Sequence, residues 1–193
     1  MQYSTFAAID IGSYDVILEI FEISKKQGIR SVDKICHRME LGKDTYTLGK
    51  IRPEMEEELC RVLADFVRIM EGYRVDAYRA MASSAISEAA NSLYVLGKIR
   101  QLTGLSVTVL SNSEQRFLGY KALAAMEDNF NKIIEKGTAI LDLDGGSFQI
   151  SLFDKDALVT TQNIRMGSLR IRERLAGIQS ETEHYEEMVE ELI

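Results

Sequence analysis

The sequence predicts an α/β protein made of two similar lobes, each a mixed sheet covered by helices. Strands and helices are expected in the order β-β-β-α-β-α-β-α, and a second series then begins with another hairpin. Helices that join strands in this order are typical of an α/β architecture. Residues 7–21 (AAIDIGSYDVILEIF) and 138–153 (TAILDLDGGSFQISLF) also share one layout: an apolar strand ending in Asp, a Gly-Ser turn and a second strand. Such a repeat indicates two similar lobes that face each other.

In the first series, strands over 4–11 and 15–23 form a hairpin, and a third strand covers about 28–41. The following loop ends at a helix start, where Pro53 suits the first helical position. The glutamates at positions 54, 56, 57 and 58 are interpreted as a solvated helix start near the positive end of the helix dipole. The helix has one apolar face to lay on a sheet, made of Met55, Leu59, Val62, Leu63, Phe66, Ile69 and Met70.

A fourth strand is expected at 75–82, and Ser83 or Ser84 caps the single helix that follows. Gly104 ends that helix, and a fifth strand covers 105–110. The next helix begins at the segment Ser-Asn-Ser-Glu, residues 111–114. One face of it carries Phe117, Tyr120, Leu123 and Ala124.

The second series consists of the hairpin at 138–153, a strand near 157–164 and a helix from about 167. The last segment opens with a capping box from Ser180 to Glu183 and then has no stop signal. We therefore expect a fragment of a longer chain, with an incomplete second lobe.

The boundary between the lobes is predicted in the segment 129–137. This assigns residues 1–136 to the first lobe and residues 137–193 to the start of the second.

The composition is that of a globular protein with a real core: 193 residues, 46% hydrophobic and 27% charged, with a single proline. The net charge of −7 argues against a general nucleic-acid or anionic-membrane binder. Cys36 and Cys60 form no motif and are expected as free thiols in a reducing cytoplasm. The sequence shows neither a signal peptide nor a membrane-spanning run, so a cytoplasmic location is expected.

The two turns carry residues that suit a polyanion. Glycine at a hairpin turn lets the backbone approach an oxygen closely, and successive N–H groups form an anion-binding concavity. Asp10 matches Asp142 at the end of the leading strands, and carboxylates there can hold Mg²⁺ directly or through water. The alternative is that both aspartates only close turns. Their matching positions in two repeats favour a cleft.

Five motifs in the same order resemble one known family. IDIGS at 9–13 resembles its first phosphate loop, and MASSAISEAAN at 81–91 its Ala-Thr-Ser-Ala-x-Arg-Glu-Ala-x-Asn motif. LSNSEQ at 110–115 is similar to Ser-Gly-x-Glu-Glu, LDLDGGSFQ at 141–149 to Asp-Ile-Gly-Gly-Gly-Ser-Thr-Glu, and RMGSLRIRERL at 165–175 to the stretch that follows. The family is the bacterial exopolyphosphatase/guanosine pentaphosphate phosphatase (Ppx/GppA) family. The resemblance implies an actin-like (ribonuclease H-like) two-lobed fold.

The resemblance also implies a phosphohydrolase that releases phosphate from polyphosphate or guanosine pentaphosphate by metal-assisted attack of water. Mg²⁺ is the implied cofactor, held by Asp10 and Asp142, and a homodimer is the expected assembly. Glu114 is implied as the base that activates water, so Glu114 and Asp142 are the implied catalytic residues. The implied phosphate ligands are Gly12, Ser13, Gly145, Gly146 and Ser147.

Glu114 has a second interpretation. It follows Ser111 by three residues, which is the spacing of a capping box at a helix start. A glutamate of that kind hydrogen-bonds the helix end and takes no part in chemistry. One side chain cannot fill both roles at once, so the two interpretations are alternatives.

The sequence departs from the family pattern inside these motifs. Tyr14 replaces an Asn, Ser87 an Arg, Asp144 the first Gly of the second loop, and Phe148 and Gln149 its final Thr-Glu. The lost arginine and the added Asp144 make the cleft less attractive to polyanions. Because Gln149 replaces the family's glutamate and so removes a carboxylate, Asp144 is expected to bind the metal in place of that glutamate. Tyr14 and Phe148 either line a narrowed cleft, stack on a base or pack into the lobe cores.

Two functions follow from these residues. The first is the Mg²⁺-assisted phosphohydrolase; the second is a catalytically degenerate homologue that binds or senses a phosphorylated ligand. A sugar kinase or ATPase of the same superfamily is disfavoured, because the stretch Ser-Ala-x-x-Glu-Ala-x-Asn matches the phosphatases. The choice between polyphosphate and guanosine pentaphosphate stays open.

Overall fold

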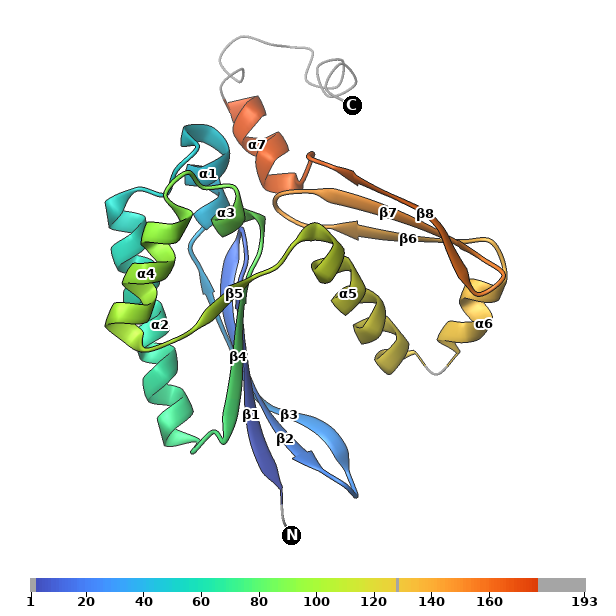
Figure 1. The fold of residues 1–193 in the computed structure, drawn as a ribbon, viewed down its shortest axis with the longest axis horizontal. Helices are drawn as coiled ribbons and strands as arrows, with labels where there is room; N and C mark the ends of the chain where they lie inside the picture. The colour runs from blue at the N-terminus through green and yellow to red at the C-terminus, as the bar shows by residue number, and fades with distance from the viewer. Residues whose placement is uncertain (1–2, 128, 177–193) are drawn as a thin grey trace.

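The computed structural model describes residues 3–127 and 129–176, which form two β-sheets with helices around them (Figure 1). The first sheet has the strand order β3-β2-β1-β4-β5. Its hairpin is antiparallel and consists of β1 (Ser4–Ile11) and β2 (Asp15–Ser24), with β3 (Gly28–Arg38) beside β2. The strands β4 (Ala77–Ala82) and β5 (Val107–Val109) run parallel to β1. The sheet is therefore mixed, as predicted.

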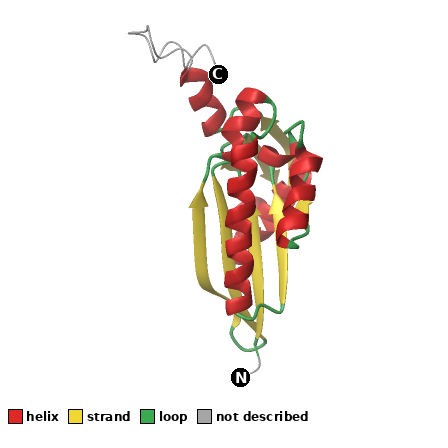
Figure 2. Cartoon of the chain, turned by 90° about the vertical axis from the view of Figure 1, so that its left-hand side faces the viewer, coloured by secondary structure: helices red, strands yellow, loops and turns green. Residues whose placement is uncertain are grey.

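One face of this sheet forms the core. Because side chains alternate along a strand, every second residue turns to that face. The helices α2 (Pro53–Gly72) and α4 (Ser92–Thr103) cover it, and the long helix α2 lies along the strands (Figure 2). The buried strand residues are Ala7, Ile9, Ile11, Val16, Leu18, Ile20, Ala80 and Ala82, and the predicted face of α2 contributes Leu59, Val62, Leu63, Phe66 and Met70.

The first turn of α2 corrects one prediction. Pro53 occupies the first helical position as expected. Glu56, predicted to be solvated, is only 3% exposed. Its carboxylate accepts a hydrogen bond from Asn91 Nδ2 at 2.8 Å and pairs with Lys98 Nζ at 3.4 Å. Glu56 lies one turn before Leu59 on the inner side of the helix, so it ties α2 to α4 instead of facing water.

Two further segments differ from the predicted elements. The stretch predicted as a loop contains α1 (Leu41–Leu48), which begins after Glu40 in the left-handed conformation with φ 51°. The single helix predicted from residue 84 is divided into the one-turn helix α3 (Ser84–Ser87) and α4. Between them, the Asn91 side chain accepts from Ile51 N at 3.0 Å and donates to Ile51 O at 2.8 Å. These two bonds hold Asn91 against the segment before α2, at the point where α3 and α4 are separated.

The second sheet is antiparallel with the order β6-β7-β8: β6 (Thr138–Leu143), β7 (Phe148–Asp154) and β8 (Ala157–Ile164). The predicted hairpin and third strand are confirmed. The helix α5 (Asn112–Met126) contacts one face, where the Tyr120 ring packs edge-on against Phe153 and its hydroxyl bonds Ser151 Oγ at 2.5 Å. The predicted boundary segment contains α6 (Phe130–Glu135), and the division at residues 136 and 137 stays a prediction.

The helix α7 (Ser168–Ala176) joins the second sheet to the first lobe (Figure 1). Arg172 donates to both carboxylate oxygens of Glu40, at 3.0 and 2.6 Å. Together with Arg38, these bonds lower the pKa of Glu40 to about 2. Lys43 of α1 pairs with Glu173 at 3.6 Å. Ion pairs between α7 and residues 40–43 thus fix how the lobes meet.

None of the helices within 3–127 and 129–176 is long and apolar enough to cross a membrane. The capping box predicted from Ser180 to Glu183 lies outside these residues.

Candidate functional site

The turn after β1 and the turn after β6 contact each other where the two lobes meet. A Cβ built on Gly145 would lie 2.9 Å from Cδ2 of Tyr14 and 3.0 Å from Cβ of Ser13. Within the first turn, Gly12 N donates to Asp15 O at 3.0 Å and closes the hairpin. Ser13 is 6% exposed, so this turn is buried in the contact. The structure therefore brings the two predicted phosphate loops together.

A group of three hydroxyls lies beside the turns. Tyr46 Oη is 2.7 Å from Ser13 Oγ and 2.7 Å from Ser84 Oγ. A Cβ on Gly146 would overlap both the Tyr46 and Ser84 hydroxyls, so a larger residue there would displace this hydroxyl group. Burial raises the pKa of Tyr46, so the phenol keeps its proton. Sequence reasoning missed Tyr46 because its segment was predicted as a loop.

Asp144 closes the second turn on itself. Its Oδ1 accepts hydrogen bonds from Gly146 N and from Ser147 N, each at 2.6 Å. Asp144 N in turn donates to Ser147 O at 3.0 Å, and Gln115 Nε2 lies 3.4 Å from Asp144 Oδ2. Two of the backbone donors expected to bind phosphate are therefore bonded to a carboxylate of the same loop.

The start of α7 binds the carbonyl groups of the same turn. Ser168 N donates to Asp144 O at 3.0 Å, and Leu169 N donates to Gly145 O at 3.1 Å. Arg170 Nε donates to Gly146 O at 2.7 Å, and its guanidinium lies 3.7 Å from the centroid of the Tyr46 ring. The turn is thus held on one side by α7 and on the other by the first lobe.

Asp10 and Asp142 lie at the ends of their strands, as predicted. Asp10 is exposed in β1, and Asp142 is exposed in β6 opposite Gln149. The surrounding protein removes part of the water that would stabilise their charges, and the nearby charge of Asp144 adds to this, so both pKa values are raised. Among residues 3–127 and 129–176, no three acidic, histidine or cysteine side chains lie close enough to hold a metal ion together.

The oxygen atoms available nevertheless fit Mg²⁺. Gln149 is 3% exposed, and its Oε1 has no hydrogen-bond partner in the described part of the chain. Gln149 and Asp142 line a pocket of about 280 Å³ between α5 and the second sheet. Mg²⁺ takes oxygen ligands, often one or two carboxylates, and keeps several waters. Asp142 and Gln149 offer oxygen donors of that kind, while Asp10 does not line this pocket and Arg116, a cation, does.

Glu114 forms the capping box that its spacing allows. Its Oε2 accepts from Ser111 N at 2.9 Å and from Ser111 Oγ at 2.7 Å, while Glu114 N donates to Ser111 Oγ at 3.3 Å. These bonds lower the pKa of Glu114. The capping interpretation is confirmed, and the role as a base stays a prediction.

The other motif departures lie around the turns. Ser87 is exposed at the end of α3, and its neighbour Glu88 pairs with Arg170 at 2.6 Å. Tyr14 is half-buried, with the Arg38 and Arg172 guanidinium carbons 5.6 and 5.7 Å from its ring centroid. Phe148 is also half-buried. Neither aromatic side chain is fully buried in a lobe core.

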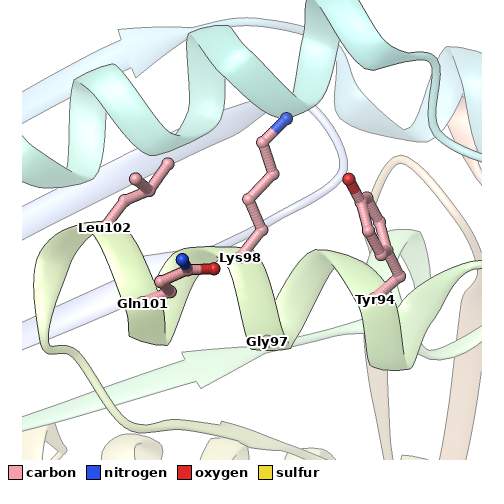
Figure 3. Close-up of a pocket in the computed structure, with 5 residues that line it drawn as sticks. All are labelled: Tyr94, Gly97, Lys98, Gln101 and Leu102. Atoms are coloured by element: carbon pink, nitrogen blue, oxygen red, sulfur yellow. The ribbon is translucent and has the colours of Figure 1, made fainter.

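A second hollow, of about 460 Å³, lies on α4 (Figure 3). Its lining residues all belong to this one helix: Tyr94, Gly97, Lys98, Gln101 and Leu102. Lys98 extends toward α2, where it pairs with the buried Glu56. Since the Lys98 ammonium is already paired with Glu56, we do not take this hollow as a second candidate for the phosphate site.

Known proteins similar to this chain include two curated relatives. The bifunctional 3-dehydroquinate synthase/phosphatase of Fusobacterium nucleatum is 22% identical over 174 residues, which cover 87% of this chain and 26% of that protein. Exopolyphosphatase 1 of Mycobacterium leprae is 26% identical over 144 residues, which cover 74% of this chain and 41% of that protein. The chain thus spans less than half the length of either relative.

The fold is that of solved phosphatases of this type. The crystal structure of an exopolyphosphatase from Cytophaga hutchinsonii matches with a TM-score of 0.77 at 20% identity, over 89% of this chain and 53% of that one. The predicted mixed α/β, actin-like fold is confirmed. The sequence pattern of the Ppx/GppA phosphatase family matches residues 19–193, and the predicted resemblance is thereby confirmed. The chain belongs to the Ppx/GppA phosphatase family.

Proposed function

We propose that the full-length protein is a phosphohydrolase that releases phosphate from polyphosphate or guanosine pentaphosphate by Mg²⁺-assisted attack of water. The observation that carries the proposal is the meeting of two glycine-containing turns, each near a strand-end aspartate, in a chain of the Ppx/GppA family. The similarity to a mycobacterial exopolyphosphatase supports the substrate class. We also propose that the protein is a cytoplasmic homodimer that binds no nucleic acid, and the net charge of −7 disfavours a nucleic-acid partner.

In this proposal, phosphate oxygens are bound by the backbone N–H groups of the glycines at 12, 145 and 146 and by the serines at 13 and 147. For Gly12 this requires its N–H to leave Asp15 O, to which it donates in the hairpin. Asp10 and Asp142 hold the cation, which supplies charge neutralisation to the phosphates when it is bound. Burial first, and the nearby Asp144 charge second, raise the pKa values of Asp10 and Asp142, and a bound cation would offset both effects on the charged carboxylates. Asp144 is proposed as a further ligand, which requires its carboxylate to leave the turn.

Glu114 is proposed as the base that activates water. In the capping box its pKa is lowered, whereas a general base works best with a pKa near the working pH. The proposal therefore requires the Glu114 carboxylate to leave Ser111 when substrate is bound.

Two variants of the full-length protein test this role, with phosphate release from long-chain polyphosphate as the assay. Ser111→Ala removes the hydroxyl of the cap but leaves the Glu114 carboxylate, while Glu114→Gln removes the carboxylate. Ser111→Ala is expected to destabilise the helix end by about 1 kcal/mol, whereas glutamine at position 114 can still accept from Ser111 N and should cost less. Only Glu114→Gln should lower the rate of phosphate release strongly, by at least about a hundredfold. Equal activity in the two variants would reduce Glu114 to a helix cap.

A second candidate function is a degenerate homologue that binds or senses a phosphorylated ligand. The capture of two turn amides by Asp144 favours it, as do Ser87 and Gln149, which lack the charges of the family pattern. Binding of guanosine pentaphosphate without turnover of either substrate would identify this function.

A further inference from the structure

The second turn already holds an anion of its own. Asp144 Oδ1 lies 2.6 Å from both Gly146 N and Ser147 N, so one oxygen accepts from two successive amides. Hydrogen bonds to an ionised oxygen are among the stronger ones in proteins, and successive backbone N–H groups are a common anion-binding concavity. The carboxylate thus occupies the place that a phosphate oxygen takes in such a concavity.

The backbone of the second turn is tightly packed, and both of its amides are already bonded to the Asp144 carboxylate. Gly145, Gly146 and Ser147 are all buried. The Tyr46 and Ser84 hydroxyls lie where a Cβ on Gly146 would be, and Gly167 approaches the turn from the other side. An incoming anion must therefore displace the Asp144 carboxylate to reach the two amides.

We propose that Asp144 is a built-in competitor of phosphate at the second turn and sets the affinity and selectivity of that turn. A tethered group competes at a high effective concentration, so a singly bound orthophosphate is at a disadvantage. A polyphosphate chain bears several charges and can hold the first turn while it displaces Asp144. The turn therefore selects extended phosphate chains over orthophosphate. The inference rests on the proposed function in that it takes this turn as a phosphate site.

The test compares Asp144→Ala with Asp144→Asn in the full chain. Alanine removes the acceptor and the charge; asparagine removes the charge but keeps an oxygen that can accept from both amides. Tripolyphosphate is titrated calorimetrically in buffer with EDTA, so that no divalent cation contributes, and orthophosphate is titrated in parallel. The ¹H,¹⁵N shifts of Gly146 and Ser147 report directly on the two amides. Asp144→Gly, the residue of the family pattern, replaces the alanine variant if that one unfolds.

The expected result is a dissociation constant for tripolyphosphate at least tenfold lower in Asp144→Ala than in the wild type, equivalent to about 1.4 kcal/mol. In Asp144→Asn the affinity for tripolyphosphate should rise by less than half of that factor. The ratio of the dissociation constants of orthophosphate and tripolyphosphate should be smaller in Asp144→Ala than in the wild type. Equal gains in the two variants would reduce the effect to net charge and overturn the inference. No gain in Asp144→Ala or Asp144→Gly would overturn it as well.

The titration measures uptake and not turnover, so it is separate from the proposed function. Tighter binding in Asp144→Ala, together with no phosphate release by the full-length protein, would support the competitor role and overturn the hydrolase. Phosphate release by the full-length protein, without tighter tripolyphosphate binding in Asp144→Ala, would support the hydrolase and overturn the competitor role.

Discussion

Replacing Gly167 by alanine should push α7 away from the second turn. A Cβ on Gly167 would overlap backbone atoms of Gly145 and Ser147, which cannot move aside as the tip of a side chain can. The φ of Gly167 is not in the left-handed region, so the cost is steric. Overpacking costs about 1–3 kcal/mol, and each hydrogen bond lost from Leu169 N or Arg170 N to Gly145 O adds about 1 kcal/mol. We expect the free energy of unfolding to fall by about 3 kcal/mol.

Urea denaturation measures this change, and Gly97→Ala is the matched control. Gly97 lies inside α4 with open space around it, so alanine there should stabilise the protein by about 1 kcal/mol through helix propensity. The same chemical change should thus have opposite signs at the two positions. A Gly167→Ala variant as stable as the wild type would refute the tight contact between α7 and the turn.

Two further changes test the ion pairs. The pKa of Glu40 is lowered to about 2, so its pairing with Arg172 stabilises the fold above its ordinary pKa of 4.5 and is lost as the pH falls toward 2. Glu40→Gln should lower the free energy of unfolding by on the order of 2 kcal/mol at pH 7 and by little at pH 2. Urea titrations that give the same loss at both pH values would contradict this. Glu56→Ala should cost about 2–4 kcal/mol, because Asn91 and the paired ammonium lose a buried acceptor. Exposed Glu57→Ala should stay within about 0.5 kcal/mol in the same assay, and a similar loss in both would argue against the buried pair.

The regular parts of the fold were predictable because local patterns determine them. The hairpins follow from period-two alternation and glycine turns, and the inner face of α2 from helical spacing. Gly104 ends α4 with φ 75°, as predicted, and Ser111 caps α5 with Glu114, which was one of the two interpretations of that spacing. Each of these signals involves residues within a few positions of one another.

What the sequence did not reveal depends on contacts between distant segments. The helix α1 has weak helix formers in its Thr-Tyr-Thr stretch and is held in place through Tyr46 by Ser13 and Ser84. Glu56 looked solvated because its partners, Asn91 and Lys98, come more than 30 residues later. One contact at the site could have been predicted from local sequence, because aspartate side chains often accept a hydrogen bond from the backbone N–H two residues later. The run that begins at Asp144 has that pattern.

Phosphate release by the full-length protein tests the central claim most directly. Long-chain polyphosphate and guanosine pentaphosphate are each incubated with the protein in Mg²⁺ and, separately, in EDTA. We predict release from at least one substrate in Mg²⁺ and none above background in EDTA. No release from either substrate in Mg²⁺ would contradict the hydrolase and leave a phosphate-binding homologue.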